Sequence, residues 1–214
     1  MRARRLTRVI VVRHGQTEWN VEARIQGQGD SKLTAEGRVQ ARAIAARLAA
    51  QPFDVLVSSD LGRAAETARA IAERCRKPIV LDARLRERHF GVGEGMTYEE
   101  VDSAYPGAFA RIRNVDPDFV IPGGESRRQL HERVVSAMDS IARTHDGKTI
   151  VVVTHGGVLA TFFRHVHAIP LDVAHPIAIT NASYNVLIHD GSRWSVETWS
   201  DNAHLEGGET FEEA

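Results

Sequence analysis

The sequence is poor in cysteine and contains no long apolar run. Cys75 is the one cysteine among 214 residues, so no disulfide can form within the chain and no thiolate metal cluster can be built. The longest apolar stretches, such as residues 9–12 and 150–153, fall far short of the roughly 20 residues that span a bilayer. The basic start at residues 1–5 leads directly into the first of these stretches, which leaves no room for a signal sequence. We therefore expect no membrane contact and a cytoplasmic location.

The sequence also lacks an excess of charge of either sign. It holds 27 basic and 28 acidic side chains, which leave a formal charge of −1. Such a balance argues against a protein that binds nucleic acid without specificity. The length fits a single domain over residues 1–214, in which a core carries an inserted segment. The oligomeric state stays open between a monomer and a homodimer.

Apolar residues recur alternately with the period of a strand and with that of a helix. We expect strands at residues 9–13, 54–57, 78–81 and 150–153, and a hairpin of residues 184–188 and 194–199 around Asp190 and Gly191. Amphipathic helices are expected from Thr34 to before Pro52, and at about residues 64–75, 130–146 and 157–164. The alternation predicts an α/β sandwich with a mostly parallel sheet. Cys75 falls on an apolar helical stripe, which predicts core packing and not a reactive thiol.

The pattern changes between residues 84 and 127, where glycine and proline are frequent and aromatic residues are interspersed. Disordered linkers are poor in aromatic residues, so this composition predicts a cap of short helices and loops inserted at about residues 88–127. The last stretch, residues 206–214, is acidic and contains glycine, and we expect it to be a mobile tail.

Chemically useful side chains follow the predicted strands. His14 comes after the strand that ends at Arg13, and His155 comes after residues 150–153. Arg63 follows the second strand, and Glu87 follows the third. Because ligands bind beyond the carboxyl ends of parallel strands, we expect these side chains to line one pocket.

This set of side chains suits phosphoryl transfer. Two guanidinium groups can hold a phosphoryl group, and an imidazole among them can attack phosphorus to give a phosphohistidine. A carboxyl group such as that of Glu87 can protonate the departing alcohol, provided that its pKa is raised by burial or by neighbouring anions. A histidine at a strand end is often merely structural, and we assign that role to His89, His131, His165 and His167. No spacing of histidines or cysteines typical of a metal site is present.

The residues around His14 form part of a longer pattern. Residues 13–20 read Arg-His-Gly-Gln-Thr-Glu-Trp-Asn, and this motif resembles that of the histidine phosphatase superfamily, the phosphoglycerate mutase-like proteins. Further blocks follow in the family's order at residues 28–41, 58–68, 85–91, 123–126, 153–157 and 181–183. The resemblance therefore covers nearly the whole chain, and it implies a three-layer α/β/α sandwich.

The resemblance also implies roles for individual residues. His14 is expected to be the phosphorylated nucleophile and Glu87 the acid and base. Arg13, Arg63 and His155 would hold phosphoryl oxygens. Asn20 would line the phosphate pocket, and Gln26 is a further candidate for binding the substrate. The family needs no metal, and we expect no cofactor.

Three functions stay open at this stage. A phosphatase of small phosphorylated metabolites is the main expectation, because residues 28–31 and the chain length resemble the phosphatase branch more than the glycolytic mutases. The alternatives are a 2,3-bisphosphoglycerate-dependent phosphoglycerate mutase and a non-catalytic module that binds phosphorylated ligands. The cap arginines Arg111, Arg113 and Arg127 are expected on the solvated surface, with contact to a second anionic group of the substrate as the alternative.

Overall fold

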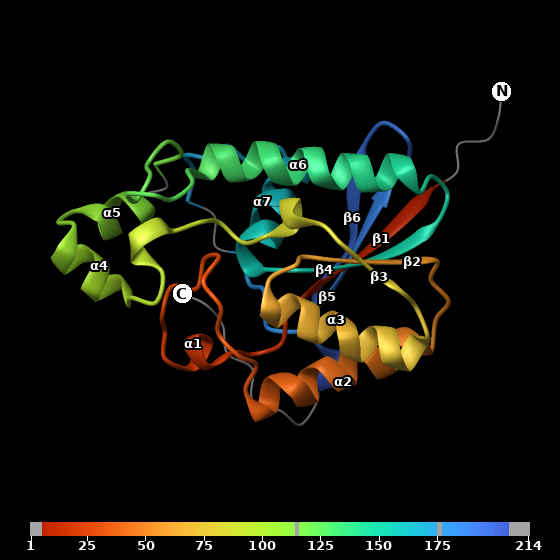
Figure 1. Ribbon diagram of the computed structural model, residues 1–214. Coiled ribbons are helices and arrows are strands. Elements are labelled where there is room, and N and C mark those ends of the chain that lie inside the picture. The colour runs from red at the N-terminus through yellow and green to blue at the C-terminus, as the bar shows by residue number, and fades with distance from the viewer. Residues whose placement is uncertain (1–5, 114–115, 175–176, 206–214) are drawn as a thin grey trace.

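The computed structural model describes residues 6–113, 116–174 and 177–205. The predicted mobile tail at residues 206–214 and the basic start at residues 1–5 lie outside this part of the chain. The described residues form a central sheet with helices on both faces, and a group of short helices lies at one end of the sheet (Figure 1). None of the described helices is both long and apolar enough to cross a membrane.

The sheet has six strands in the order β3-β2-β4-β1-β5-β6. Strands β3, β2, β4 and β1 run parallel to one another, β5 runs antiparallel to β1, and β6 runs antiparallel to β5. The predicted mostly parallel sheet with an edge hairpin is therefore confirmed. The strands are β1 (Thr7–Arg13), β2 (Val55–Ser58), β3 (Ile79–Leu81), β4 (Thr149–Thr154), β5 (Tyr184–His189) and β6 (Trp194–Asp201).

Two pairs of helices cover the two faces of the sheet. Alternate residues of β1 belong to different cores: Val9 and Val11 pack with α6 (Arg127–Thr144) and α7 (Gly156–Val166), whereas Ile10 and Val12 pack with α2 (Ala35–Ala49) and α3 (Gly62–Cys75). Side chains alternate between the faces of a strand, so a continuous apolar run fills both cores at once. The predicted three-layer α/β/α sandwich is confirmed.

The ends of the helices follow from local sequence. Thr34 caps α2 by accepting a hydrogen bond from the backbone N–H of Gly37 at 2.9 Å. Ser126 caps α6 in a reciprocal pair with Gln129. Cys75 ends α3 and packs against the core between α2 and α3, where burial raises the pKa of its thiol. Its predicted packing role is therefore consistent with its surroundings.

Residues 88–127, predicted as an inserted cap, contain the helices α4 (Tyr98–Ala104) and α5 (Ala108–Arg113). A third short helix, α1 (Glu18–Val21), lies in the loop after β1, and single turns of 3₁₀ helix occur at Ala83–Leu85, Gly91–Gly93 and Ala203–Leu205. The cap has its own small core of Val101, Ala108, Ile112 and Ile121. Ile25, in the loop between β1 and α2, packs into this core. This contact fixes the cap beside the loop that follows β1.

The loop after β1 lies directly against the first turn of α2. A Cβ atom added at Gly37 would lie 2.0 Å from the carbonyl oxygen of Gln16, and one added at Gly15 would lie 2.4 Å from the carbonyl oxygen of Gly37. Only glycine allows two backbones to approach this closely. The two glycines therefore set the position of the backbone on either side of His14.

We expect Gly37→Ala to destabilise the protein, although the same change at an open helical position stabilises by about 1 kcal/mol. The added methyl group must displace the backbone of Gln16, and overpacking of this kind costs about 1–3 kcal/mol. Urea denaturation measures the difference. Arg42→Ala, an exposed position on the same helix, serves as the control and should change stability by less than about 0.5 kcal/mol. An unchanged or raised stability of Gly37→Ala would show that the contact is loose.

Candidate active site

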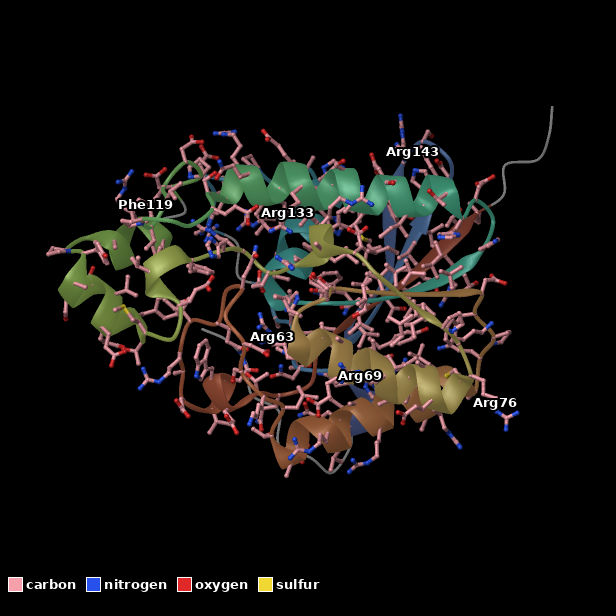
Figure 2. All side chains as sticks on the ribbon, in the orientation of Figure 1. Arg63, Arg69, Arg76, Phe119, Arg133 and Arg143 are labelled. Atoms are coloured by element: carbon pink, nitrogen blue, oxygen red, sulfur yellow. The ribbon has the colours of Figure 1, made fainter. Side chains whose placement is uncertain are left out.

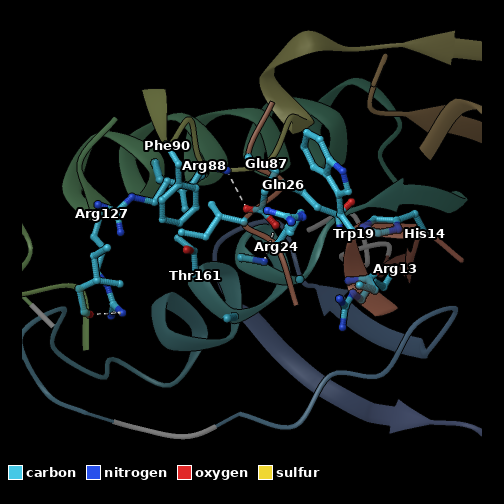
Figure 3. A pocket seen from close by; sticks show the side chains of 18 of the residues that line it. Arg13, His14, Trp19, Arg24, Gln26, Glu87, Arg88, Phe90, Arg127 and Thr161 are labelled. Carbon is cyan, nitrogen blue, oxygen red and sulfur yellow. Dashed lines mark hydrogen bonds between the residues drawn. The ribbon is translucent and has the colours of Figure 1, made fainter. Parts of the chain in front are cut away.

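A cavity of about 460 Å³ lies beyond the carboxyl end of β1, between the sheet and the cap (Figure 3). Its lining comes from the loop after β1, the start of α3, the segment after β3, the cap, and the helices α6 and α7. Arg13, His14, Asn20, Gln26, Arg63 and Glu87 all line it. The structure thus brings together six of the seven residues expected at the site, and the seventh, His155, lies directly beside His14.

The two histidines meet because of the register between β1 and β4. Arg13 pairs with Thr154 in parallel register, so the next residue of each strand is a histidine. The ring centroids of His14 and His155 are 5.2 Å apart, and the ring planes are tilted by 56°. Both side chains are almost completely withdrawn from solvent.

Hydrogen bonds fix the tautomer of His14. Its Nδ1 lies 2.8 Å from the carbonyl oxygen of Gly15, which can only accept, so Nδ1 carries the proton. Its Nε2 accepts a hydrogen bond from Nε of Arg63 at 3.3 Å. Burial, with the charges of Arg63 and Arg13, lowers the pKa of His14 well below its ordinary value. His14 is therefore a neutral imidazole whose Nε2 lone pair is directed at the guanidinium group of Arg63.

His155 is neutral for similar reasons. Its Nε2 lies 2.8 Å from Oγ of Ser59, a residue that immediately follows β2. Burial and the nearby charge of Arg63 lower the pKa of His155 well below its ordinary value. Its Nδ1 is buried and has no hydrogen-bond partner among the described residues. Such an atom is uncommon in a folded protein.

The two arginines are held by backbone carbonyls. Arg63, at the start of α3, donates to the carbonyl oxygens of Gly29 at 2.8 Å and Gly27 at 2.6 Å. Arg13, at the end of β1, donates to the carbonyl oxygen of Ile179 at 2.5 Å. Figure 2 shows Arg63 directed into the middle of the molecule, whereas Arg76 and Arg143 project outward from it. Both site arginines are thus fixed as positive charges beside His14.

Glu87 accepts two backbone hydrogen bonds. The N–H of Arg88 donates to Oε1 at 2.7 Å, and the N–H of Gly157, in the first turn of α7, donates to Oε2 at 2.8 Å. A Cβ atom added at Gly157 would lie 2.3 Å from Oε1, so a side chain there would displace the carboxylate. This glycine, two positions after His155, therefore allows Glu87 to lie at the end of α7.

Asn20 and Gln26 take different positions in the cavity wall. Oδ1 of Asn20 accepts from the backbone N–H of Thr17 at 3.0 Å and from Nδ2 of Asn181 at 3.3 Å. Gln26 is buried, and its Oε1 has no hydrogen-bond partner among the described residues. Gln26 is therefore a residue of the cavity wall whose buried amide oxygen is unsatisfied among the described residues.

Two residues near the site were not predicted from the sequence. Asn181 donates through Nδ2 to the carbonyl oxygen of His14 at 3.2 Å, and Ser59 contacts His155. Both residues lie in sequence blocks that resemble the family pattern, at residues 58–68 and 181–183, and this resemblance could have identified them as candidates. Their contacts span 167 and 96 positions of the chain, which explains why spacing alone did not reveal them.

Arg111, Arg113 and Arg127 were predicted to lie on the solvated surface, and the structure contradicts this prediction for one of them. Arg111 is exposed and pairs with Asp116, as expected, and the side chain of Arg113 lies outside the described part of the structure. Arg127, in contrast, is partly buried and lines the cavity. The prediction is wrong for Arg127 because its side of the first turn of α6 faces the cavity, whereas Arg128 in the same turn faces solvent.

The remaining predictions concern histidines and metals. None of His89, His131, His165 and His167 lines the cavity. Within the described residues, no group of three or more histidine, cysteine, aspartate or glutamate side chains is arranged to hold a metal ion.

The buried histidines predict how stability depends on pH. An unfolded chain binds protons on both side chains below about pH 6.5, whereas the folded chain keeps His14 and His155 neutral to much lower pH. The free energy of unfolding should therefore decrease as the pH falls below about 6.5, by up to about 1.4 kcal/mol per pH unit for each histidine. Urea denaturation between pH 7.5 and 5.5 measures this slope. The slope should be smaller in His155→Gln, and equal slopes in the two proteins would contradict the assignment.

Comparisons with known proteins agree with this geometry. Residues 9–202 match the model of the histidine phosphatase superfamily (branch 1). The chain is 42% identical over 202 residues to phosphoglycerate mutase-like protein 4 of Arabidopsis thaliana, covering 92% of this chain and 86% of that protein. It is 40% identical over 203 residues to a metal-independent phosphoserine phosphatase of the same plant, covering 94% and 84%.

A solved structure shows the same fold. YhfR of Bacillus stearothermophilus superposes with a TM-score of 0.89 at 36% sequence identity, over 94% of this chain and all of that one. The family match covers the cavity and every residue assigned to the site. The chain therefore belongs to branch 1 of the histidine phosphatase superfamily.

Proposed function

We propose that the protein is a phosphomonoester hydrolase that works without a metal ion and forms a phosphohistidine on His14. The observation that carries this proposal is the fixed tautomer of His14, whose Nε2 lone pair points toward Nε of Arg63 inside the cavity. A neutral, oriented imidazole next to two guanidinium groups is the arrangement that attack on a bound phosphoryl group requires.

The first half of the reaction transfers the phosphoryl group to the enzyme. Nε2 of His14 attacks phosphorus, and the bond between phosphorus and the ester oxygen breaks. Glu87 gives a proton to the departing oxygen, which leaves as an alcohol. In the second half, Glu87 takes a proton from a water molecule that attacks the phosphohistidine, and inorganic phosphate leaves. Nδ1 of His14 keeps its proton throughout, because it donates a hydrogen bond to the carbonyl oxygen of Gly15.

The surrounding side chains stabilise the transferring group. Arg13 and Arg63 face it with positive charge that is already in place, so little reorganisation accompanies the transition state. The buried Nδ1 of His155 and the amide of Gln26 have polar atoms without a partner among the described residues, and a protonated phosphoryl oxygen or a bound water is a suitable partner for them. Asn20, held by Asn181, lines the same pocket.

Glu87 must carry a proton when the alcohol leaves. The N–H groups of Arg88 and Gly157 stabilise its charged form before the substrate binds. A phosphoryl group with two negative charges in the same cavity has the opposite effect, because like charges disfavour the carboxylate. Substrate binding thus supplies the condition under which Glu87 acts as an acid, and release of phosphate restores the carboxylate.

Hydrolysis is favoured over the alternatives by two observations. A relative 40% identical is named a metal-independent phosphoserine phosphatase, and this chain keeps both a nucleophile and a proton donor in one cavity. A module that only binds phosphorylated ligands has no need of the donor. The second candidate is a bisphosphate-dependent mutase, since another relative is named phosphoglycerate mutase-like. A coupled assay separates the two, because a mutase moves phosphate between the hydroxyls of glycerate faster than it releases phosphate.

We propose a small phosphorylated metabolite as the substrate, since the cavity of about 460 Å³ is in the range of small-molecule sites. We also propose a cytoplasmic location, because a chain with one cysteine forms no internal disulfide and therefore suits a reducing compartment.

Replacement of the nucleophile should abolish turnover. We expect His14→Ala to lose at least about 10³-fold in kcat, since the atom that accepts the phosphoryl group is removed. Alkaline quenching of the wild-type enzyme during turnover, followed by peptide mass spectrometry, should find the phosphoryl group on residue 14. The control His131→Gln lies outside the cavity and should be labelled like the wild type. A label on His155 would overturn the assignment.

Replacement of the proton donor should have an effect that depends on the leaving group. For Glu87→Gln we expect kcat/KM to fall by about 10²–10⁴-fold with alkyl phosphates, because an alkoxide leaves poorly without a proton. The fall should be much smaller with 4-nitrophenyl phosphate, whose leaving group needs no proton. Glu132→Gln, an exposed position on α6, is the matched control. Equal losses with both classes of ester would show that Glu87 is not the acid.

A further inference from the structure

The end of the cavity away from His14 is also rich in arginine. Arg88, Arg127 and Arg164 line the same cavity as the phosphoryl site. Figure 3 shows Arg127 and His14 at opposite ends of the pocket, with Glu87 and Gln26 between them. These three guanidinium groups play no part in the transfer described above.

Arg127 has an unusual environment for a cation. Its guanidinium group donates to the carbonyl oxygen of Ile112 at 3.3 Å, and in the part of the chain that the structure describes no carboxylate lies within ion-pair distance of it. Burial lowers the pKa of Arg127 to about 10, and the positive charges of Arg88 and Arg164 act in the same direction. The folded protein therefore holds this cation where neither water nor an anion fully stabilises it.

The neighbouring residue shows that this is not a general property of the region. Arg128 is exposed, and its Nε donates to Asp118 at 2.7 Å. Arg111, on α5, pairs with Asp116 at 2.6 Å. Surface arginines around the cap thus have carboxylate partners, whereas Arg127, one position before Arg128, faces the cavity.

Arg88 and Arg164 add two further positive charges at this end of the cavity. Arg88 is buried, and it donates to the carbonyl oxygens of Glu125 at 2.9 Å and Phe119 at 3.0 Å. The carboxylate of Glu125 is itself engaged by Arg133 at 2.7 Å. Arg164 is buried on α7 and donates to the carbonyl oxygen of Pro170 at 2.9 Å. The carbonyl oxygens named here carry no net charge, so these hydrogen bonds do not cancel the charge of either group. The carboxylates of Glu125 and Glu87 act favourably on the charge of Arg88.

Apolar side chains make up much of the remaining wall. Phe90, Tyr98, Ile112, Leu130, Leu171 and Ile177 line the cavity. A ligand that extends from the phosphoryl site to Arg127 therefore contacts apolar side chains as well as the polar groups between the two ends (Figure 3).

We propose that Arg127 and Arg164, with the fixed charge of Arg88 behind them, form a second anion-binding subsite that recognises an anionic group on the alcohol portion of the substrate. The substrates are then phosphomonoesters that carry a phosphate at one end and a carboxylate or a second anion at the other, joined by a short, largely apolar linker. This inference rests on the proposed phosphatase function and specifies its substrate class. Binding of the second anion restores to Arg127 the stabilisation that burial removes.

A series of matched esters tests the proposal. The probes are ω-phosphooxy carboxylates with two to six methylene groups and the corresponding primary carboxamides, which have the same shape and no charge. We expect one chain length at which the wild-type enzyme prefers the acid over the amide by about tenfold or more in kcat/KM, since a charge-assisted hydrogen bond contributes this much. An ω-phosphooxy phosphate of the same length shows whether the subsite prefers a carboxylate or a second phosphate.

Variants assign the preference to named residues. In Arg127→Gln the ratio of acid to amide should fall toward one, and in Arg164→Gln it should fall in the same direction. Arg128→Gln is the matched control, because it removes a guanidinium group one position along the chain that pairs with Asp118 outside the cavity. The control should keep the wild-type ratio. Thermal unfolding of each variant identifies any that do not fold, and in that case the wild-type ratio alone decides.

The outcomes separate the two proposals. If acids and amides are hydrolysed equally well by the wild type at every length, the second subsite does not exist, but the phosphatase function stands. If neither class is hydrolysed and 4-nitrophenyl phosphate is also left intact, the phosphatase function itself fails. If Arg127→Gln and Arg164→Gln keep the wild-type ratio, the anion is recognised elsewhere and the assignment to these arginines is wrong.

Discussion

The hydrogen bond between Nδ1 of His14 and the carbonyl oxygen of Gly15 is the interaction on which the rest of the site depends. It leaves Nε2 as the ring nitrogen that carries the lone pair, which accepts the hydrogen bond from Nε of Arg63, and burial keeps the ring neutral. The carbonyl group of Gly15 can lie next to the ring of His14 because the backbone of residues 15–16 packs closely against Gly37 in the first turn of α2. The helix α2 therefore contributes to catalysis without placing a side chain in the cavity, through the position that it gives to one peptide group.

The charges in the cavity explain why this arrangement selects anions. The wall contains six arginines, and Glu87 is the one carboxylate among the described residues that line it. The arginines are Arg13, Arg24, Arg63, Arg88, Arg127 and Arg164. Positive charge of this density destabilises any further cation, which adds to burial in keeping both histidines neutral. A neutral histidine is a nucleophile, whereas a protonated one is not. In the proposed reaction the same guanidinium groups thus attract the phosphoryl group and keep His14, its acceptor, in the reactive neutral form.

Much of this could be predicted from the sequence, and the reasons for the exceptions are physical. The strands β1, β2 and β4 are visible in the sequence as apolar runs. A parallel sheet places His14, His155 and Glu87 at one edge whatever the details of the loops. The tautomer of His14 could not be predicted, because it depends on the orientation of one carbonyl. The position of Arg127 was predicted wrongly, since composition cannot show whether the first turn of α6 faces solvent or a cap that packs over it. The contact of Asn181 with the backbone of His14 joins distant segments and becomes visible only when the sheet is assembled.

The cap and the phosphoryl site are connected by a short chain of hydrogen bonds. Oε1 of Glu94, in the cap, accepts from the backbone N–H of Gln28 at 2.8 Å and from that of Phe90 at 2.9 Å. The residues on either side of Gln28 are Gly27 and Gly29, whose carbonyl oxygens hold the guanidinium group of Arg63. A displacement of the cap would therefore move the loop that positions Arg63 beside His14. In the proposed reaction the nucleophile comes from the end of a sheet strand, and the cap forms much of the wall around the departing alcohol. Contacts between the cap and the alcohol would therefore also affect the position of Arg63 at the phosphoryl group.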